Sequence, residues 1–118
     1  MRRFNFYETF YLTRPDLAEE DVSRLNERLK ESLSNHKGEI MRFGKWDERD
    51  LAYRIADYTR GVYYIMVYRS QPSAAIEIEK NLRFFNTDVL RFMTLNISEE
   101  EALSEKRSSD NNSNNGEV

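Results

Sequence analysis

The chain has 118 residues, of which 39% are hydrophobic and 33% charged, and its formal net charge is −3. This length is typical of one domain around one hydrophobic core. The sequence contains no cysteine, which excludes disulfides, thiolate nucleophiles and zinc–thiolate sites and fits the reducing cytoplasm. No segment approaches the ~20 consecutive apolar residues of a membrane span. The N-terminal MRRFNFYETFYLT alternates like a strand and lacks a cleavage site, which argues against a signal peptide.

Composition changes near residue 98. Residues 1–97 hold 16 Lys and Arg against 15 Asp and Glu, whereas residues 98–118 hold 2 against 6. The second segment is rich in Ser, Asn and Glu and has no apolar periodicity, which is typical of disorder. The sequence therefore predicts a folded domain over 1–97 and a disordered acidic tail over 98–118.

The first half of the domain reads as strand, helix and strand. Aromatic residues alternate with polar ones from Phe4 to Thr13, and RPD ends that strand. Residues 17–38 predict a helix, because Val22, Leu25, Leu29 and Leu33 recur at helical spacing and acids crowd the first turn. A second strand is expected over 39–46 and 51–55, with a bulge around residues 47–48.

The second half reads as strand, helix and strand. The turn ADYTRG joins the second strand to the apolar run GVYYIMVY in a hairpin. Residues 74–85 predict a helix with Ser73 as its N-cap. After a turn at residues 86–88, the run VLRFMTLNI predicts the last strand.

The element order is therefore β-α-β-β-α-β. It predicts an α+β, ferredoxin-like sandwich with a four-stranded antiparallel sheet and two helices on one face. The other sheet face is left uncovered, although the third strand is apolar on both faces. Either Tyr63, Ile65 and Val67 or Val62, Tyr64, Met66 and Tyr68 point to it. Adjacent apolar residues on an exposed sheet indicate an interface.

Candidate catalytic groups are few. His36, the only histidine, stands at a predicted helix end, where a cation is favourable. Asp47, Glu48 and Asp50 fit a turn or bulge and have no further metal-binding motif beside them. The four glycines are scattered and form no phosphate-binding loop. We therefore expect no enzyme activity, no cofactor, no metal and no small-molecule substrate.

Arginines on strands and turns favour nucleic-acid binding, because arginine contacts phosphate bidentately and stacks on bases. A free RNA-recognition module shares the element order, but the run RGVYYIMV matches its third-strand motif only in part. A dimeric regulatory domain of ferredoxin-like fold is a second alternative.

Four stretches together resemble the S-six family of bacterial small-subunit ribosomal proteins. They are Tyr7-Glu8 with Arg14-Pro15-Asp16; Trp46 and Arg49 with Leu51-Ala52-Tyr53 and Ile55; Gly61 to Tyr68 with Pro72; and Leu82-Arg83-Phe84 with Asn86, Val89-Leu90-Arg91 and Met93. The resemblance covers about residues 4 to 97.

This resemblance implies the ferredoxin-like fold, a place in the cytoplasmic small ribosomal subunit, and a structural role in translation rather than membrane association. It also implies binding to the central domain of small-subunit ribosomal RNA together with ribosomal protein S-eighteen. The expected RNA-binding residues are Arg2, Arg3, Arg49, Arg54, Arg83 and Arg91. The expected partner-binding residues are Phe10, Leu12, Tyr63, Ile65 and Phe92.

Overall fold

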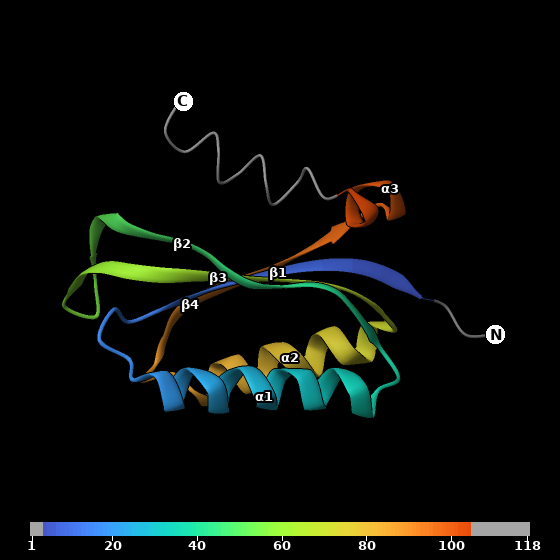
Figure 1. Ribbon diagram of the computed structural model, residues 1–118, viewed down its shortest axis with the longest axis horizontal. Coiled ribbons are helices and arrows are strands. Elements are labelled where there is room, and N and C mark those ends of the chain that lie inside the picture. The colour runs from blue at the N-terminus through green and yellow to red at the C-terminus, as the bar shows by residue number, and fades with distance from the viewer. Residues whose placement is uncertain (1–3, 105–118) are drawn as a thin grey trace.

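The structure is a computed structural model that describes residues 4–104 (Figure 1). Its elements are β1 (Asn5–Thr13), α1 (Glu19–Asn35), β2 (Glu39–Ile55), β3 (Tyr58–Ser70), α2 (Pro72–Phe84), β4 (Val89–Ile97) and α3 (Glu99–Leu103). The predicted β-α-β-β-α-β order is confirmed, with one short helix added after it. No helix in this part of the chain is long and apolar enough to cross a membrane.

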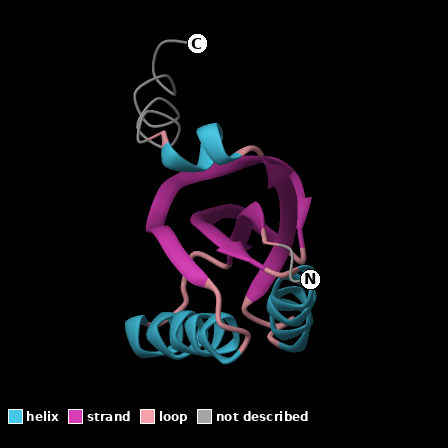
Figure 2. Ribbon diagram, turned by 90° about the vertical axis from the view of Figure 1, so that its right-hand side faces the viewer, coloured by secondary structure: helices cyan, strands magenta, loops and turns pink. Residues whose placement is uncertain are grey.

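The four strands form one sheet in the order β2-β3-β1-β4, and every neighbouring pair is antiparallel. Helices α1 and α2 lie side by side on one face of this sheet (Figures 1 and 2). The predicted ferredoxin-like sandwich is therefore confirmed. Figure 2 also shows that the sheet is strongly curled rather than flat.

The main core lies between the sheet and the two helices. Tyr7 and Tyr11 from β1 and Met66 and Tyr68 from β3 meet apolar side chains of both helices, among them Leu25, Leu29, Leu33, Ile78 and Leu82. These contacts determine on which face of the sheet each β3 side chain lies, because side chains alternate between the two faces along a strand. Tyr63, Ile65 and Val67 point to the face opposite the helices, which we call the second face.

The β2–β3 hairpin turns through Ala56 and Asp57, whose φ angles are 48° and 71°. Two successive positive φ values are typical of the type I′ turn that joins right-twisted strands. Strand β2 is continuous, and its pairing with β3 shifts register between Ile40 and Arg42, Lys45 and Asp47, and Asp50 and Ile55. Such irregularities increase local twist and help to curl a sheet.

The start of α2 differs from the prediction. The helix begins at Pro72, and its N-cap is Gln71, which makes no side-chain capping bond. Proline suits the first helical position because its φ is already helical and it has no N–H to leave unpaired. Ser73 is therefore not the cap; its Oγ instead lies 3.2 Å from Nδ1 of His36, the residue that ends α1.

The end of the domain also differs from the prediction. Residues 99–103, expected in a disordered tail, form α3. The Ser98 hydroxyl accepts a hydrogen bond from the Glu101 N–H, and the Glu101 carboxylate accepts one from the Ser98 N–H. This capping box, with Ala102 fully buried, holds the short helix in place. The rest of the predicted tail, residues 105–118, lies outside the described residues.

Candidate nucleic-acid and protein interface

One end of the second face is covered by the chain itself. Helix α3 stands on the side of the sheet opposite α1 and α2 (Figure 1). Its Ala102 joins Ile65, Val67 and Ile97 in a second, smaller hydrophobic cluster. Helix α3 therefore covers part of the second face, which explains in part why β3 carries apolar residues on both faces.

Trp46 of β2 covers the middle of the second face. Its ring centroid lies 5.0 Å from that of Phe10 and 5.8 Å from that of Tyr63. It also packs against the cluster that contains Ile65 and Val67. The Trp46 Nε1 is buried and has no hydrogen-bond partner among residues 4–104. The β2–β3 hairpin thus folds its own aromatic side chain onto the face that the helices leave open.

Arg49 extends this aromatic group with a positive charge. Its guanidinium lies 5.8 Å from the ring centroids of both Trp46 and Tyr63. It also forms an ion pair of 2.8 Å with Asp47. The hydrogen bond from Arg49 and that from the Glu48 N–H lower the pKa of the Asp47 carboxyl below its usual value. The arginine is held in place while part of its side chain remains exposed to solvent.

A second arginine–aromatic pair joins the two edges of the sheet. The guanidinium of Arg91, on edge strand β4, lies 5.4 Å from the ring centroid of Tyr53, on edge strand β2. Because the sheet is curled, the two edge strands approach each other closely enough for this contact, although β3 and β1 lie between them in the sheet. The Tyr53 side chain remains accessible to solvent, since the residue is 61% exposed.

A shallow hollow of about 320 Å³ lies beside these pairs. It is lined by Phe10, Tyr63, Arg91, Phe92 and Met93. Met93 is 53% exposed, and Leu95, two residues on along β4, is also exposed. This part of the second face therefore combines aromatic rings, two guanidinium groups and exposed aliphatic surface.

Four of the sequence-predicted residues meet here: Phe10, Tyr63, Arg49 and Arg91. Arg54 is exposed on β2, next in sequence to Tyr53. Arg2 and Arg3 lie outside the described residues.

The other predicted residues are placed differently. Arg83 lies on α2, where it stands 4.0 Å from Glu79 and 5.4 Å from the Phe92 ring centroid. Phe92 lines the hollow but packs mainly against the helix-side core. Leu12 and Ile65 are buried, so neither offers side-chain surface to a partner in this structure.

Three contributors were missed by sequence reasoning: Trp46, Tyr53 and Met93. Their proximity to the arginines depends on the curl of the sheet, which residue spacing does not reveal. All three residues stood in stretches used for the family resemblance, and that was the available signal.

The acidic residues of β2 form no metal site. Asp47 pairs with Arg49, Glu48 with Lys45 and Asp50 with Arg60, at 2.8, 3.4 and 2.7 Å. Among residues 4–104, no group of three or more acidic, histidine or cysteine side chains is arranged to hold a metal ion. Ion pairing is thus the observed role of these carboxylates.

Comparisons with known proteins agree with this fold. The chain is 36% identical over 94 residues to the small ribosomal subunit protein bS6 of Trichlorobacter lovleyi, covering 80% of this chain and 76% of that protein. It is 31% identical over 93 residues to bS6 of Desulforamulus reducens, covering 79% and 97% of the two chains. The crystal structure of 30S ribosomal protein S6 from Thermotoga maritima superposes with a TM-score of 0.73 at 23% identity, over 92% of this chain and 99% of that one.

The family model described as ribosomal protein S6 matches residues 6–96, which include every strand of the sheet except the first residue of β1 and the last of β4. The chain therefore belongs to the ribosomal protein S6 family, and the resemblance found in its sequence is confirmed.

Proposed function

We propose that this protein is a structural component of the small ribosomal subunit that binds the central domain of small-subunit ribosomal RNA together with ribosomal protein S-eighteen. The observation that carries the proposal is the pair of guanidinium groups, Arg49 and Arg91, held over aromatic rings on the exposed part of the second face.

This arrangement suits RNA chemically. A guanidinium that rests its flat side on a ring still directs N–H groups outward to phosphate oxygens. An exposed aromatic ring such as Tyr53 can stack on an unpaired base. The neighbouring hollow offers a recess in which a base or an inserted side chain can be enclosed. The same surface can therefore position RNA backbone and bases together.

A protein partner suits the aliphatic part of the same surface. Met93 and Leu95 lie exposed on edge strand β4, next to the hollow. Contiguous exposed apolar surface on a soluble protein is a common sign of a protein interface. Phe10 and Tyr63 connect this aliphatic part to the two arginines, so one partner could contact the protein and the RNA at once.

Family membership supports the structural role. Ribosomal protein S6 is a structural, non-enzymatic family, and the relatives are named as small ribosomal subunit proteins. The place of action that follows is the ribosome of the cytoplasm. The ordinary roles of His36 in ending α1 and of the acidic residues in ion pairs fit this proposal.

The test is binding of the full chain to a central-domain RNA fragment in magnesium buffer, with and without S-eighteen. Arg91→Glu and Arg49→Glu should each weaken RNA binding and lower the dependence of log affinity on log salt by about one unit. Arg24→Glu, on the helix side, is the matched control and should have little effect.

Equal losses for Arg24→Glu and Arg91→Glu would show nonspecific charge attraction and contradict the proposed RNA surface. A free RNA-recognition module would bind RNA without any contribution from S-eighteen. A regulatory domain would form a homodimer and bind neither, which sedimentation of the free chain would reveal.

A further inference from the structure

A line of exposed side chains runs along the outer side of α2. Ile76 is 65% exposed and Phe84 is 73% exposed, the two highest values among the large hydrophobic residues of the described part of the chain. Lys80 lies midway between them in the sequence and is exposed as well. Because residues four apart lie on the same side of a helix, Ile76, Lys80 and Phe84 form one continuous surface, which we call the α2 stripe.

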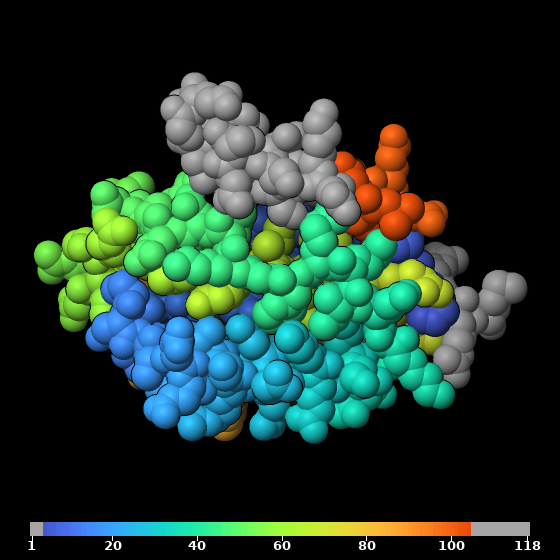
Figure 3. Space-filling model, in the orientation of Figure 1, coloured from blue at the N-terminus to red at the C-terminus, as the bar shows by residue number. Residues whose placement is uncertain are grey.

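The α2 stripe faces away from the sheet because the other side of the helix is fixed in the core. The buried residues of α2 are Ala74, Ala75, Ile78, Asn81 and Leu82. Asn81 also ties α2 to α1, since its Nδ2 donates a hydrogen bond of 2.6 Å to the Ser32 Oγ. In Figures 1 and 2 the two helices form the lower layer of the molecule, and in Figure 3 the side chains of α1 cover the front of this layer. The stripe therefore belongs to the side of the molecule opposite the second face.

The charges of α2 balance one another. The helix has two acids followed by two bases, Glu77, Glu79, Lys80 and Arg83. Arg83 stands 4.0 Å from Glu79 and covers the Phe92 ring at 5.4 Å, so this pair is engaged within the chain. Neither Glu77 nor Lys80 forms an ion pair with any residue of the described part. One carboxylate and one ammonium group beside the stripe are therefore left for a contact outside the chain.

A second copy of α2 that runs antiparallel to the first matches this stripe. With a rise of about 1.5 Å per residue, Ile76 and Phe84 lie about 6 Å to either side of Lys80 along the helix axis. A two-fold axis that passes beside Lys80 therefore sets Ile76 of each copy against Phe84 of the other, which makes the same apolar contact twice. This arrangement removes both exposed apolar side chains of each copy from water.

The same two-fold axis pairs the charges. Glu77 and Lys80 lie three residues apart, which places them on the same flank of the helix and about 4.5 Å apart along its axis. In an antiparallel pair related by such an axis, each flank of one helix lies beside the same flank of the other. The Lys80 ammonium of each copy thus meets the Glu77 carboxylate of the other, while the lysine methylene groups cover the apolar contact.

The balance of charge favours a second copy over RNA as the occupant of the stripe. Phosphate is attracted by surfaces with an excess of Lys and Arg, and α2 has no such excess because each base is matched by an acid. An antiparallel second copy supplies both charges where they are needed. It also sets the two helix dipoles in opposite directions, which is the favourable arrangement.

We infer that two copies of this chain associate through their α2 helices in an antiparallel two-fold pair. Ile76 of each copy packs against Phe84 of the other, and the charges beside them pair across the axis. The inference does not rest on the proposed function, because the arginines proposed to bind RNA lie on the other side of the molecule. A contact one helix wide is a small interface, below about 1,200 Å² in total, and such interfaces give weak, reversible association.

Analytical ultracentrifugation of the full chain in low salt, at concentrations up to the millimolar range, measures this association. Ile76→Ala and Phe84→Ala should each weaken it by about tenfold or more, because each substitution removes a contact that the dimer makes twice. Leu103→Ala is the matched control, since it truncates an exposed apolar side chain of α3 on the opposite side of the sheet, and it should leave the association unchanged. The unfolding midpoint, followed by circular dichroism, shows that each variant is folded.

A charge exchange tests the pairing itself. Glu77→Lys and Lys80→Glu should each weaken self-association in low salt by about fivefold or more, because every contact across the axis then joins like charges. A mixture of these two variant chains should dimerise again, since each lysine of one chain meets a glutamate of the other. Glu99→Lys, on the exposed side of α3, is the control for charge reversal and should have no effect.

Recovery of the dimer only in the mixture supports the antiparallel pairing. A chain that stays monomeric at every concentration overturns the inference, and so does a dimer that all four α2 variants form as well as the unaltered chain. If Leu103→Ala dissociates the dimer and Ile76→Ala does not, the copies meet through the second face and the inference is wrong.

Binding to the central-domain RNA fragment, measured in parallel, separates this inference from the proposed function. If the unaltered chain dimerises but does not bind the RNA, the proposed function fails and the inference stands. If the unaltered chain binds the RNA as a monomer at every concentration, the inference fails and the proposed function stands. If Phe84→Ala weakens RNA binding, the α2 stripe is an RNA contact and the inference is wrong.

Discussion

Leu12 of β1 lies directly over Gly61 of β3 on the second face of the sheet. A Cβ atom added at Gly61 would overlap the Leu12 side chain and come within 3.0 Å of the Thr13 carbonyl oxygen. The absence of a side chain at residue 61 leaves room for Leu12, near the end of β1, to be completely buried. This contact explains why the Leu12 side chain is buried within the packing of the sheet.

Gly61→Ala is therefore expected to lower the free energy of unfolding by about 1–3 kcal/mol, because it overpacks this contact. Gly44→Ala is the matched control within the sheet, since nothing lies within 4 Å of a Cβ added there; its effect should stay within about 0.5 kcal/mol. Urea unfolding measures both values. In the background of Leu12→Ala, the cost of Gly61→Ala should shrink, because the two residues are coupled. Additive costs would contradict the overlap.

The order of strands and helices could be predicted because each element carries its own periodicity. Val22, Leu25, Leu29 and Leu33 define one helix face without any tertiary information. The inward face of β3 could not be predicted, because residues 61–68 are apolar on both faces. The deciding facts are tertiary: Met66 and Tyr68 meet α1 and α2.

Helix α3 was missed for a different reason. The run SEEEAL is acidic and contributes only one fully buried side chain, Ala102, so its composition is typical of a tail. Its S-x-x-E spacing, from Ser98 to Glu101, is the signature of a capping box and was the available signal. The contact between Arg91 and Tyr53 had no such signal, because it joins opposite edges of the sheet through curvature alone.

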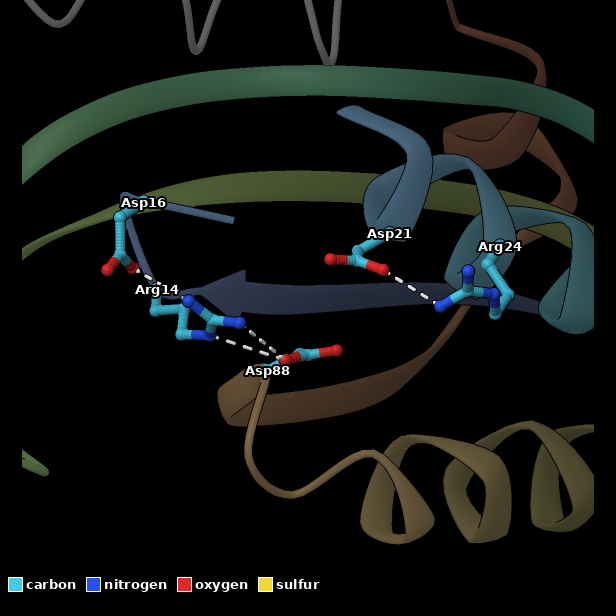
Figure 4. A network of polar contacts seen from close by, with 5 residues as sticks. All are labelled: Arg14, Asp16, Asp21, Arg24 and Asp88. Atoms are coloured by element: carbon cyan, nitrogen blue, oxygen red, sulfur yellow. Dashed lines mark hydrogen bonds and ion pairs between the residues drawn. The ribbon is translucent and has the colours of Figure 1, made fainter. Parts of the chain in front are cut away.

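Arg14 should stabilise the fold through two carboxylates that it connects (Figure 4). Its Nη2 lies 3.1 Å and its Nε 3.3 Å from Oδ1 of Asp88, and its Nη1 lies 3.0 Å from Asp16. The hydrogen bond to Asp16 and, to a lesser degree, the one to Asp88 raise the pKa of the guanidinium, whereas burial acts in the opposite direction. Arg14→Ala removes these bonds at the junction of β1 and β4 and should cost about 1–2 kcal/mol of stability.

The control for Arg14 is Arg24, which forms an exposed pair with Asp21 in the first turns of α1 (Figure 4). The Arg24 side chain is 68% exposed against 22% for Arg14. Arg24→Ala should cost less than about 0.5 kcal/mol. Chemical denaturation of both variants in low and high salt makes the comparison. Equal costs would show that the bridge between Asp16 and Asp88 adds nothing beyond a surface ion pair.

Buried tyrosines should make the protein less stable in alkali. Burial raises the pKa of Tyr68 to about 12, although its hydrogen bond with Thr9 acts in the opposite direction. Burial also raises the pKa of Tyr11, whose hydroxyl donates a hydrogen bond of 2.6 Å to Asn26. In the unfolded chain each phenol loses its proton near pH 10.0. Stability is thus fully present below pH 10 and falls as the pH rises toward 12.

Tyr68→Phe should flatten this decline between pH 10 and 12, as measured by the free energy of unfolding at several pH values. It should also lower stability at neutral pH by about 1 kcal/mol, because the hydrogen bond to Thr9 is lost. Tyr53→Phe, at an exposed position, is the matched control. An unchanged slope for Tyr68→Phe would show that this phenol is not held protonated by burial.

Helix α3 should contribute to the stability of the domain through its one buried residue. Ala102 packs with Ile65, Val67 and Ile97, and a charged side chain there would have to be desolvated or would push the helix away. Ala102→Asp should therefore lower the free energy of unfolding by more than about 1 kcal/mol. Thermal and urea unfolding of the full chain measure the effect.

Two shortened chains locate the origin of that contribution. A chain ending at Ser104 keeps α3 and should retain the stability of the full chain. A chain ending at Ile97 lacks the helix and should be less stable, because Ile97 is then exposed to water. Ser98→Ala tests the capping box separately and should cost about 0.5–2 kcal/mol if α3 must be helical to cover the sheet. Equal stability of the two shortened chains, together with a neutral Ala102→Asp, would mean that α3 rests on the second face without stabilising it. The end of the second face that α3 covers would then be available to a partner.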